Sequence, residues 1–314
     1  MSTATAPGKI ILFGEHAVVY GQPAIAVPVA QVRAEALAEP WPGGAAGTGQ
    51  ILAPNVGLDT TLDQLSTDHP LAAALCGVQT MLGVGQFPPF RLTIRSTIPV
   101  AGGMGSGAAV SVAVIRAMSV FLGQPLLDEQ VNALAYEVEK LHHGTPSGID
   151  NTVITYARPV YFVRSQPIET FEVPTPFTII IADTGVASST AITVGDVRKA
   201  WQADPERYNK IFQWVGNLVM KARRAIEAGT PETLGPLMDE NHTQLQKMGV
   251  SSPELDHLVD VARGAGALGA KLSGGGRGGN MIALVEKEKA SQIANVLRKA
   301  GAVRTVVTEI GGLP

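Results

Sequence analysis

Within its N-terminal half the chain reads Ile98-Pro99-Val100-Ala101-Gly102-Gly103-Met104-Gly105-Ser106-Gly107-Ala108-Ala109-Val110. Residues 90–97, just before this stretch, alternate apolar and polar side chains, which is typical of a half-buried strand. Residues 108–122, which include its end, are rich in Ala, Val and Met and stop at Gly123 and Pro125, which predicts a buried helix. The glycine-rich stretch therefore joins the end of a strand to the start of a helix.

Such a junction between a strand and a helix favours the binding of an anion. Glycine has no Cβ to hold a ligand away from the backbone. The first helical turn presents unpaired N–H groups and the positive end of the helix dipole. A nucleotide phosphate is a natural occupant. A purely structural tight turn is the alternative.

Two standard nucleotide loops fit less well. The Walker loop ends in Gly-Lys-Ser/Thr, and this stretch contains no lysine. The dinucleotide fingerprint needs an acidic residue at the end of the next strand, whereas Asp128 and Glu129 fall at a predicted helix start.

Composition restricts the class of protein. The chain has 314 residues, which favours two domains. A hydrophobic fraction of 45%, a charged fraction of 16% and a net charge of -3 indicate a compact protein without a nucleic-acid or membrane partner. The single Cys76 suits a reducing compartment, and the sequence shows neither a signal peptide nor a membrane span. We therefore expect a cytoplasmic protein.

The N-terminal segment is predicted to begin with a buried strand over residues 9–13. Lys9 opens this strand, and on residue type alone it reads as a solvated lysine at a strand end. Glu15 and His16 follow in a Gly-flanked loop, and polar residues in such loops often line sites.

Further elements follow in order. We predict one or two strands over 23–39, an exposed loop over 41–50, and helices over 69–82 and from Asp128 onward. Residues 55–68 show no clear pattern. The helix from Asp128 has an apolar stripe formed by Val131, Leu134, Ala135, Val138 and Leu141, with Glu139 at its edge.

A loop rich in Gly, Pro and hydroxyl residues then leads to Asp150 at the head of the next element. An aspartate in that position is most often a helix cap. A strand over 159–164 and a connector over 165–176 would close this half.

The second half begins with a buried strand over 177–182. Helices over 204–228, 230–248 and 252–264 follow, and then strands over 270–272 and 280–285, a helix over 287–300 and a strand over 303–310. This order is that of a split βαβ, ferredoxin-like domain.

Four stretches together resemble the motifs of the GHMP small-molecule kinases, in the form found in members that act on mevalonate. They are Pro7-Gly8-Lys9 with Gly14-Glu15-His16-Ala17-Val18-Val19-Tyr20-Gly21, the Pro99–Ala109 loop, His143-Gly144-Thr145-Pro146-Ser147-Gly148-Ile149-Asp150-Asn151, and Lys271-Leu272-Ser273-Gly274-Gly275-Gly276. They occur in the family's order and span almost the full chain.

The resemblance implies an α+β, two-domain GHMP kinase fold. Residues 1–174 would form an N-terminal α/β domain like domain 2 of ribosomal protein S5, with a left-handed βαβ crossover. Residues 175–314 would form a ferredoxin-like α/β domain, and the active site would lie in the cleft between the two.

The implied chemistry is transfer of the γ-phosphoryl group of ATP to the primary C5 hydroxyl of mevalonate. By resemblance, Asp150 would be the base with Lys9 beside it, and Glu139 and Ser106 would hold Mg²⁺. The residues expected at ATP are Pro99, Gly102, Gly103, Met104, Gly105, Ser106, Gly107 and Ala108. Those expected at the substrate are Glu15, His16, Ser147, Gly148 and Gly275. This assignment suits phosphoryl transfer, which needs positioning, charge neutralisation and an acceptor for the hydroxyl proton.

Two motifs depart from the family pattern. Met104 and Gly107 stand where leucine and a second serine are usual, and Arg277 and Asn280 stand where glycine and cysteine are common. These departures bear on the metal geometry and on the contacts of the C-terminal loop. Separately, other substrates stay open: phosphomevalonate, the mevalonate 3-hydroxyl, homoserine or a sugar such as galactose. A non-catalytic ligand-binding relative is a further alternative, and the sequence leaves a homodimer open.

Overall fold

The computed structural model describes residues 1–99, 102–143 and 146–311. The chain forms two compact units, each assembled from separate segments. The first comprises Met1–Gly8, Val32–Val100 and Met104–Ala157, and the second comprises Lys9–Gln31, Ala101–Gly103 and Arg158–Pro314. Strands β1 (Ser2–Phe13) and β2 (Ala24–Pro40) run through both units. A domain boundary between residues 174 and 175 stays a prediction.

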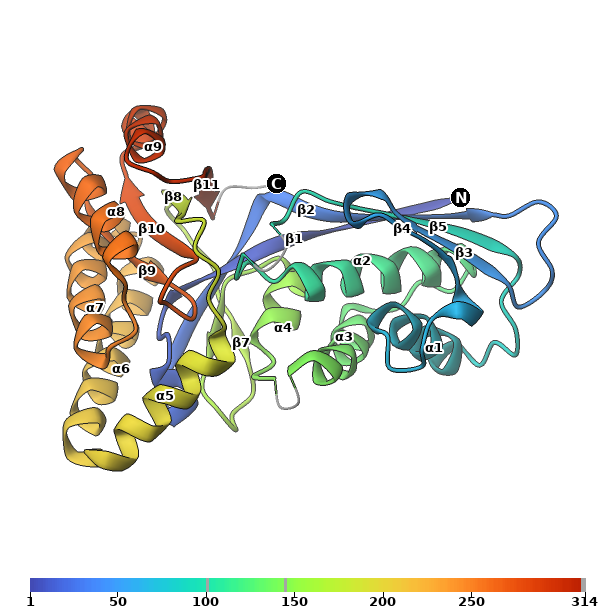
Figure 1. Ribbon diagram of the computed structural model, residues 1–314, viewed down its shortest axis with the longest axis horizontal. Coiled ribbons are helices and arrows are strands. Elements are labelled where there is room, and N and C mark those ends of the chain that lie inside the picture. Colours follow the sequence, from blue (N-terminus) through green and yellow to red (C-terminus); the bar gives the residue numbers. More distant parts are fainter. Residues whose placement is uncertain (100–101, 144–145, 312–314) are drawn as a thin grey trace. The chain divides into compact units, whose positions relative to one another are not determined.

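The first unit is a sheet covered by helices. Its strands are hydrogen-bonded in the order β4 (Leu58–Thr61), β3 (Gly49–Ala53), β5 (Phe90–Ser96) and β2. Strands β3 and β5 are parallel and are connected through helix α1 (Pro70–Leu82). Figure 1 shows four helices on one face of this sheet: α1, α2 (Ser106–Phe121), α3 (Asp128–His143) and α4 (Ile149–Tyr156).

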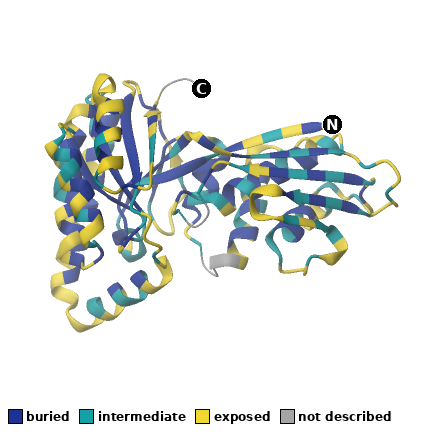
Figure 2. Ribbon diagram, turned by 45° about the horizontal axis from the view of Figure 1, so that its top comes forward, coloured by how far each residue is buried: buried dark blue, intermediate teal, exposed yellow. Residues whose placement is uncertain are grey.

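Burial follows the sequence pattern in most of this unit, as Figure 2 shows for the sheet and its helices. Strand β5 alternates buried and partly exposed residues as predicted. On α3, Val131, Ala135 and Val138 are buried. The prediction for Leu141 is wrong, because its side chain is 48% exposed. At about 100° per residue, Leu141 lies roughly 80° away from Val131 around the helix.

The second unit is built on an antiparallel sheet. Its strand order is β11 (Arg304–Ile310), β8 (Phe177–Asp183), β10 (Asn280–Val285) and β9 (Gly269–Ser273). Numbered along the chain, this is the order 4-1-3-2 of a ferredoxin-like domain, which confirms the predicted fold. The helices are α5 (Thr190–Ala203), α6 (Pro205–Glu227), α7 (Leu234–Met248), α8 (Pro253–Gly264) and α9 (Ala290–Lys299).

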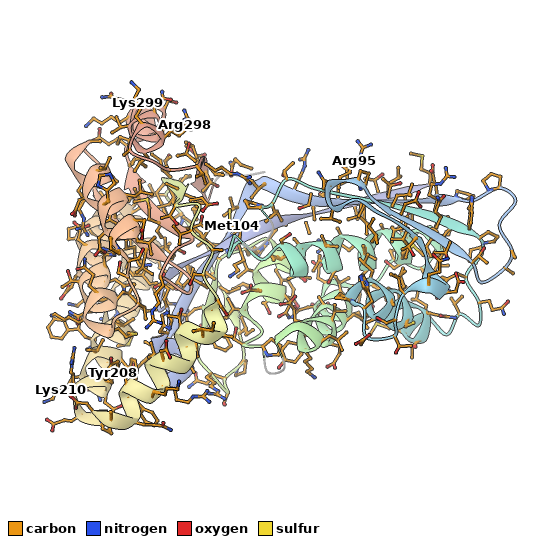
Figure 3. The ribbon with its side chains drawn as sticks, viewed as in Figure 1. Arg95, Met104, Tyr208, Lys210, Arg298 and Lys299 are labelled. Atoms are coloured by element: carbon orange, nitrogen blue, oxygen red, sulfur yellow. The ribbon has the colours of Figure 1, made fainter. Side chains whose placement is uncertain are left out.

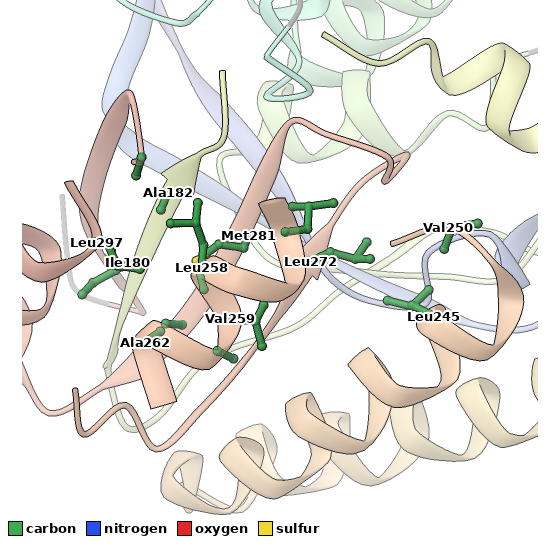
Figure 4. Packing of buried hydrophobic residues seen from close by; sticks show 14 of the residues in the cluster. Ile180, Ala182, Leu245, Val250, Leu258, Val259, Ala262, Leu272, Met281 and Leu297 are labelled. Atoms are coloured by element: carbon green, nitrogen blue, oxygen red, sulfur yellow. The ribbon is translucent and has the colours of Figure 1, made fainter. Parts of the chain in front are cut away.

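One apolar core holds this second unit together. Figure 4 shows Ile180 and Ala182 of β8, Leu272 of β9 and Met281 of β10 packed with side chains of the covering helices. The start of β2 joins the same unit, since Ala24–Ala26 pair with β6 (Val160–Phe162), which in turn pairs with β7 (Glu169–Thr170).

Several features were not predicted from the sequence. Helix α5 was not predicted, and the expected connector over 165–176 contains the short strand β7. No element was predicted over residues 55–68. There the 3-10 helices η2 (Pro54–Val56) and η3 (Leu62–Gln64) precede and follow β4. No helix in the described parts of the chain has the length and apolarity to cross a membrane.

Candidate active site

The glycine-rich loop leads directly into helix α2. Gly105 is the N-cap of α2 in a left-handed conformation, with a φ of 73°, so the helix begins at Ser106. Ser106 and Gly107 are therefore its first residues, and their N–H groups have no partner in the preceding turn. Met104 is buried at the start of this helix (Figure 3), and Ala108 is also buried. This geometry presents N–H donors and the positive helix end to an anion.

A buried carboxylate lies beside this first turn. Glu139, on α3, is only 5% exposed. A Cβ built on Gly107 would lie 3.6 Å from Glu139 Oε1. Helices α2 and α3 pack together and so fix this approach. A carboxylate next to an anion-binding helix end suits a hard cation that also contacts phosphate oxygens.

The described residues contain no group of three or more His, Cys, Asp and Glu side chains that could hold a metal ion. Mg²⁺ bound to nucleotides commonly uses one or two carboxylates together with phosphates and water. Glu139 and the hydroxyl of Ser106 fit that requirement.

Asp150 lies in the first turn of α4. The N-cap of α4 is Gly148 with a φ of 86°, so the reading of Asp150 as a cap is wrong. The Ser147 hydroxyl accepts a hydrogen bond from the Ile149 N–H at 3.3 Å. Asp150 is half-buried.

A polar network ties α4 to α3. Asn151 Nδ2 donates to Asn132 Oδ1 at 2.6 Å. The Thr152 hydroxyl donates to the Gly148 carbonyl at 2.7 Å, within the same turn as Asp150. Asn151 and Thr152 are both 3% exposed. Because buried hydrogen-bonded side chains have little freedom, Asp150 is presented in a defined direction.

Lys9 belongs to the second unit and lies in β1. It is only 7% exposed, so the reading of Lys9 as a solvated strand-end lysine is wrong. A buried ammonium group is costly unless it is engaged by polar or charged groups. Its burial agrees with a role inside a site.

Glu15 forms an ion pair with Lys271 of β9, and both side chains are almost completely buried. Desolvation raises the pKa of Glu15 and lowers the pKa of Lys271, because each charge has lost its water. The Lys271 ammonium also lies 5.8 Å from the centre of the Phe13 ring. The carboxylate of Glu15 is thus engaged by the protein itself and anchors the loop that follows β1.

His16 is held against the glycine-rich stretch Gly274–Gly279, called the third glycine loop below. Its Nε2 lies 2.9 Å from the Gly275 carbonyl, which can only accept, so Nε2 carries the proton. Its backbone φ is 59°, an unusual value for a side-chain residue. Burial lowers the pKa of His16 to about 4, so the ring is neutral at pH 7 and Nδ1 is an acceptor.

The third glycine loop is closely packed within its unit. The Ser273 hydroxyl donates to the Ile11 carbonyl at 2.8 Å. A Cβ on Gly275 would lie 2.6 Å from Thr190 Oγ1, so only glycine fits there. Asn280 Nδ2 donates to the Gly102 carbonyl at 2.5 Å and so reaches the phosphate loop.

The second unit therefore contains Lys9, Glu15, His16, Gly102, Gly103 and Gly275, and the first contains Pro99, Met104, Gly105, Ser106, Gly107, Ala108, Glu139, Ser147, Gly148 and Asp150. Parts of two quoted motifs, residues 100–101 and 144–145, lie outside the described residues. Sequence reasoning assigned no role to Lys271, Asn132 or Asn280. Lys271 is the first residue of a motif quoted above and Asn280 was noted as a departure from the family pattern, whereas nothing in the sequence pointed to Asn132.

Residues 70–158 match the N-terminal domain of the GHMP kinases, and residues 222–303 match their C-terminal domain. The chain is also 38% identical to the mevalonate kinase of Thermococcus sibiricus, over 98% of this chain and 95% of that protein. The chain belongs to the GHMP kinase family.

Other GHMP kinases agree in sequence and in structure. The mevalonate kinase of Pyrococcus horikoshii is 36% identical over 96% of this chain and 93% of its own. The crystal structure of L. major mevalonate kinase in complex with R-mevalonate is 30% identical with a TM-score of 0.84, covering 99% of this chain and 96% of that one. The galactokinase of Lactococcus lactis, at 19% identity and a TM-score of 0.77, shares the fold.

Proposed function

We propose that this GHMP kinase transfers the γ-phosphoryl group of ATP to the C5 hydroxyl of mevalonate. The observation that carries the proposal is the similarity to mevalonate kinases, at 36–38% identity over nearly the whole chain. The glycine loop at the start of α2, with the buried Glu139 beside it, supplies the features that an ATP-dependent kinase needs.

We assign the proton transfer to Asp150. Its carboxylate would accept the proton of the C5 hydroxyl as that oxygen bonds to the γ-phosphorus and the bond to the ADP oxygen breaks. The buried ammonium group of Lys9 would neutralise charge on the transferred group. The fixed position of α4, with Asn151 bonded to Asn132, supports this assignment because a base must be held within hydrogen-bond reach of its proton.

We assign nucleotide binding to the loop Pro99, Gly102, Gly103, Met104, Gly105, Ser106, Gly107 and Ala108. The N–H groups at the start of α2 would bind phosphate oxygens. Glu139 and Ser106 would hold Mg²⁺, which, when bound, neutralises charge on the phosphates.

We assign substrate binding to Glu15, His16, Ser147, Gly148 and Gly275. The neutral ring of His16 offers Nδ1 as an acceptor for a substrate hydroxyl, since Nε2 is occupied by the Gly275 carbonyl. Glu15 would act through its ion pair with Lys271, which fixes the loop that carries His16.

A substrate panel tests the proposal. The purified chain is mixed with ATP, Mg²⁺ and, in turn, mevalonate, phosphomevalonate, homoserine or galactose, and ADP release is followed with a coupled assay. We expect release that depends on mevalonate. A clear preference for another member of the panel would replace mevalonate as the substrate, and release with none of them would favour a non-catalytic relative.

A further inference from the structure

Arg277 interrupts the third glycine loop, Gly274–Gly279, with a large side chain. Its backbone φ is 57°, in the left-handed region that glycine occupies without strain and other residues rarely adopt. Its glycine neighbours Gly274, Gly276, Gly278 and Gly279 also have positive φ. Glycine would adopt this left-handed conformation with less strain. The backbone therefore does not explain why an arginine stands at this position.

The guanidinium group is held on one side. Arg277 Nη1 donates to Asp196 Oδ2 on α5 at 2.6 Å, and Nε donates to the Gly249 carbonyl at 3.4 Å. This contact with Arg277 is the main cause that lowers the pKa of Asp196. Both side chains are about two-fifths exposed. Among the described residues, the second terminal nitrogen, Nη2, has no protein partner, so it is available to an anion.

Other basic groups lie in the same part of the second unit. Lys199 Nζ is 3.8 Å from Asp196 Oδ1 and its side chain is 81% exposed, whereas the groups at the glycine loop itself are neutral or engaged. His16, bonded to the carbonyl of Gly275 two residues before Arg277, is neutral at pH 7. Lys271 is buried and engaged by Glu15. The charge of Arg277 reaches His16, where it contributes to the lowered pKa of the ring.

The proposed substrate is a carboxylate at neutral pH, and it therefore needs a cationic or strongly donating partner. A guanidinium group matches a carboxylate in shape and forms charge-assisted hydrogen bonds to it. Resting on the proposed function, we infer that Arg277 is a specificity-determining residue that binds the C1 carboxylate of mevalonate through Nη2. Asp196 is its positioning residue and orients the guanidinium by holding Nη1.

A purely structural role for the pair makes a different prediction. Arg277 and Asp196 also connect the glycine loop to α5, which buries only Thr193 and Val197. If the pair only connected the loop to α5, removing Arg277 and removing Asp196 would change the KM for mevalonate equally. If Arg277 binds the carboxylate, its removal is far more damaging than the removal of Asp196.

The test compares Arg277→Gly, Arg277→Lys and Asp196→Ala with the wild type. Arg277→Gly suits the left-handed backbone and so preserves the loop. We expect the KM for mevalonate to rise about 10- to 100-fold in Arg277→Gly and about threefold in Asp196→Ala, with Arg277→Lys in between. The KM for ATP should stay constant. Arg198 is exposed on α5. The control Arg198→Gln removes one arginine charge there, as Arg277→Gly does in the loop, and should behave as the wild type.

A substrate analogue isolates the carboxylate. In 3-methylpentane-1,3,5-triol the C1 carboxylate of mevalonate is replaced by a neutral hydroxymethyl group, and its affinity is measured as an inhibition constant against mevalonate. We expect the wild type and Arg277→Gly to bind the triol equally well. Raised salt should weaken mevalonate binding to the wild type but not to Arg277→Gly.

An unchanged KM for mevalonate in Arg277→Gly would overturn the inference, as would equal losses in Arg277→Gly and Asp196→Ala. The same loss of affinity for the triol as for mevalonate would also overturn it. Failure of the proposed function is seen separately, because the wild type itself would then not phosphorylate mevalonate.

Discussion

At the scale of single residues, Gly107 and Glu139 define the candidate metal site. Gly107 has an ordinary backbone conformation, and a Cβ there would meet Glu139 Oε1 at 3.6 Å, an ordinary contact distance. A serine therefore fits at Gly107 without displacing the helix, and its hydroxyl would lie next to the carboxylate.

The metal assignment predicts opposite effects for two substitutions. Glu139→Gln removes a charged ligand and should raise the Mg²⁺ concentration for half-maximal rate by about tenfold or more. Gly107→Ser should lower it by about two- to threefold, because a hydroxyl replaces an exchanging water. Titration of rate against Mg²⁺ measures both, with the exposed Glu137→Gln on the same helix as control. An unchanged Mg²⁺ dependence in Glu139→Gln would remove Glu139 from the metal site.

Asp150→Asn tests the proposed base. The change is nearly isosteric, so we expect the fold and the KM for ATP to be retained. The kcat should fall by about 10²–10⁴, the usual contribution of a positioned base. Asp128→Asn, also in the first turn of a helix of the first unit, serves as the control in steady-state kinetics. Near-normal turnover in Asp150→Asn would show that its carboxylate is not the proton acceptor.

Residue positions were easier to predict than residue partners. The resemblance pointed to Lys9 and Asp150, but the readings from residue type alone are wrong, because Lys9 is buried and the N-cap of α4 is Gly148. The Glu15–Lys271 pair joins residues 256 positions apart. No local pattern predicts such a pair, since it arises only when β1 and β9 come together in the fold.

At the scale of elements, β10 is linked to the phosphate loop. Asn280, the first residue of β10, is 5% exposed and donates to the Gly102 carbonyl. Asn280 stands where cysteine is common in the family, and a thiol is a much weaker donor than an amide. This hydrogen bond therefore supports the phosphate loop from β10.

Loss of the hydrogen bond from Asn280 to Gly102 should weaken the binding of ATP rather than the binding of mevalonate. Asn280→Ala should raise the KM for ATP about three- to tenfold, the range expected for one part-buried hydrogen bond. The KM for mevalonate should change little. Steady-state kinetics with each substrate varied in turn measures this split, and the exposed Asn217→Ala on α6 is the control. An equal rise in both KM values would contradict a local role in the loop.

The elements that the sequence predicted are those with a strong apolar pattern. Helix α2 buries residues on nearly all sides, and β5 alternates regularly, so both were predicted within two residues. Helix α5 escaped prediction because only Thr193 and Val197 are buried along its length, which leaves little periodicity. Strand β7 has two residues, both exposed, and is defined by pairing with β6 alone.

At the scale of the whole molecule, two buried histidines link stability to pH. Burial lowers the pKa values of His16 and His242 to about 4 from the ordinary value of 6.5. His242 Nδ1 accepts a hydrogen bond from the Leu272 N–H at 3.3 Å, and Nε2 lies 3.1 Å from Asp256 Oδ1. Between these pKa values the unfolded chain binds more protons than the folded chain, so acid favours unfolding.

The free energy of unfolding should therefore fall as pH decreases from 6.5 toward 4, by up to about 1.4 kcal/mol per pH unit for each histidine. Above pH 6.5 the titration of these two histidines should no longer change the free energy of unfolding. In His242→Asn the amide oxygen can still accept from Leu272, and the slope should drop by about half. Urea unfolding at a series of pH values measures the slope of the free energy of unfolding against pH. His257→Asn, at an exposed position, is the control. An unaltered slope in His242→Asn would show that His242 does not titrate in this way.

The most direct test of the whole account is the proton-coupled ³¹P spectrum of the product formed from ATP and mevalonate. Phosphate on the primary C5 oxygen couples to the adjacent methylene protons, whereas phosphate on the tertiary C3 oxygen has no such neighbours. We predict a phosphomonoester triplet that grows as ATP is consumed and is absent without mevalonate. A singlet would place the phosphate on the 3-hydroxyl, and the absence of any new phosphomonoester would contradict a mevalonate kinase activity for this chain.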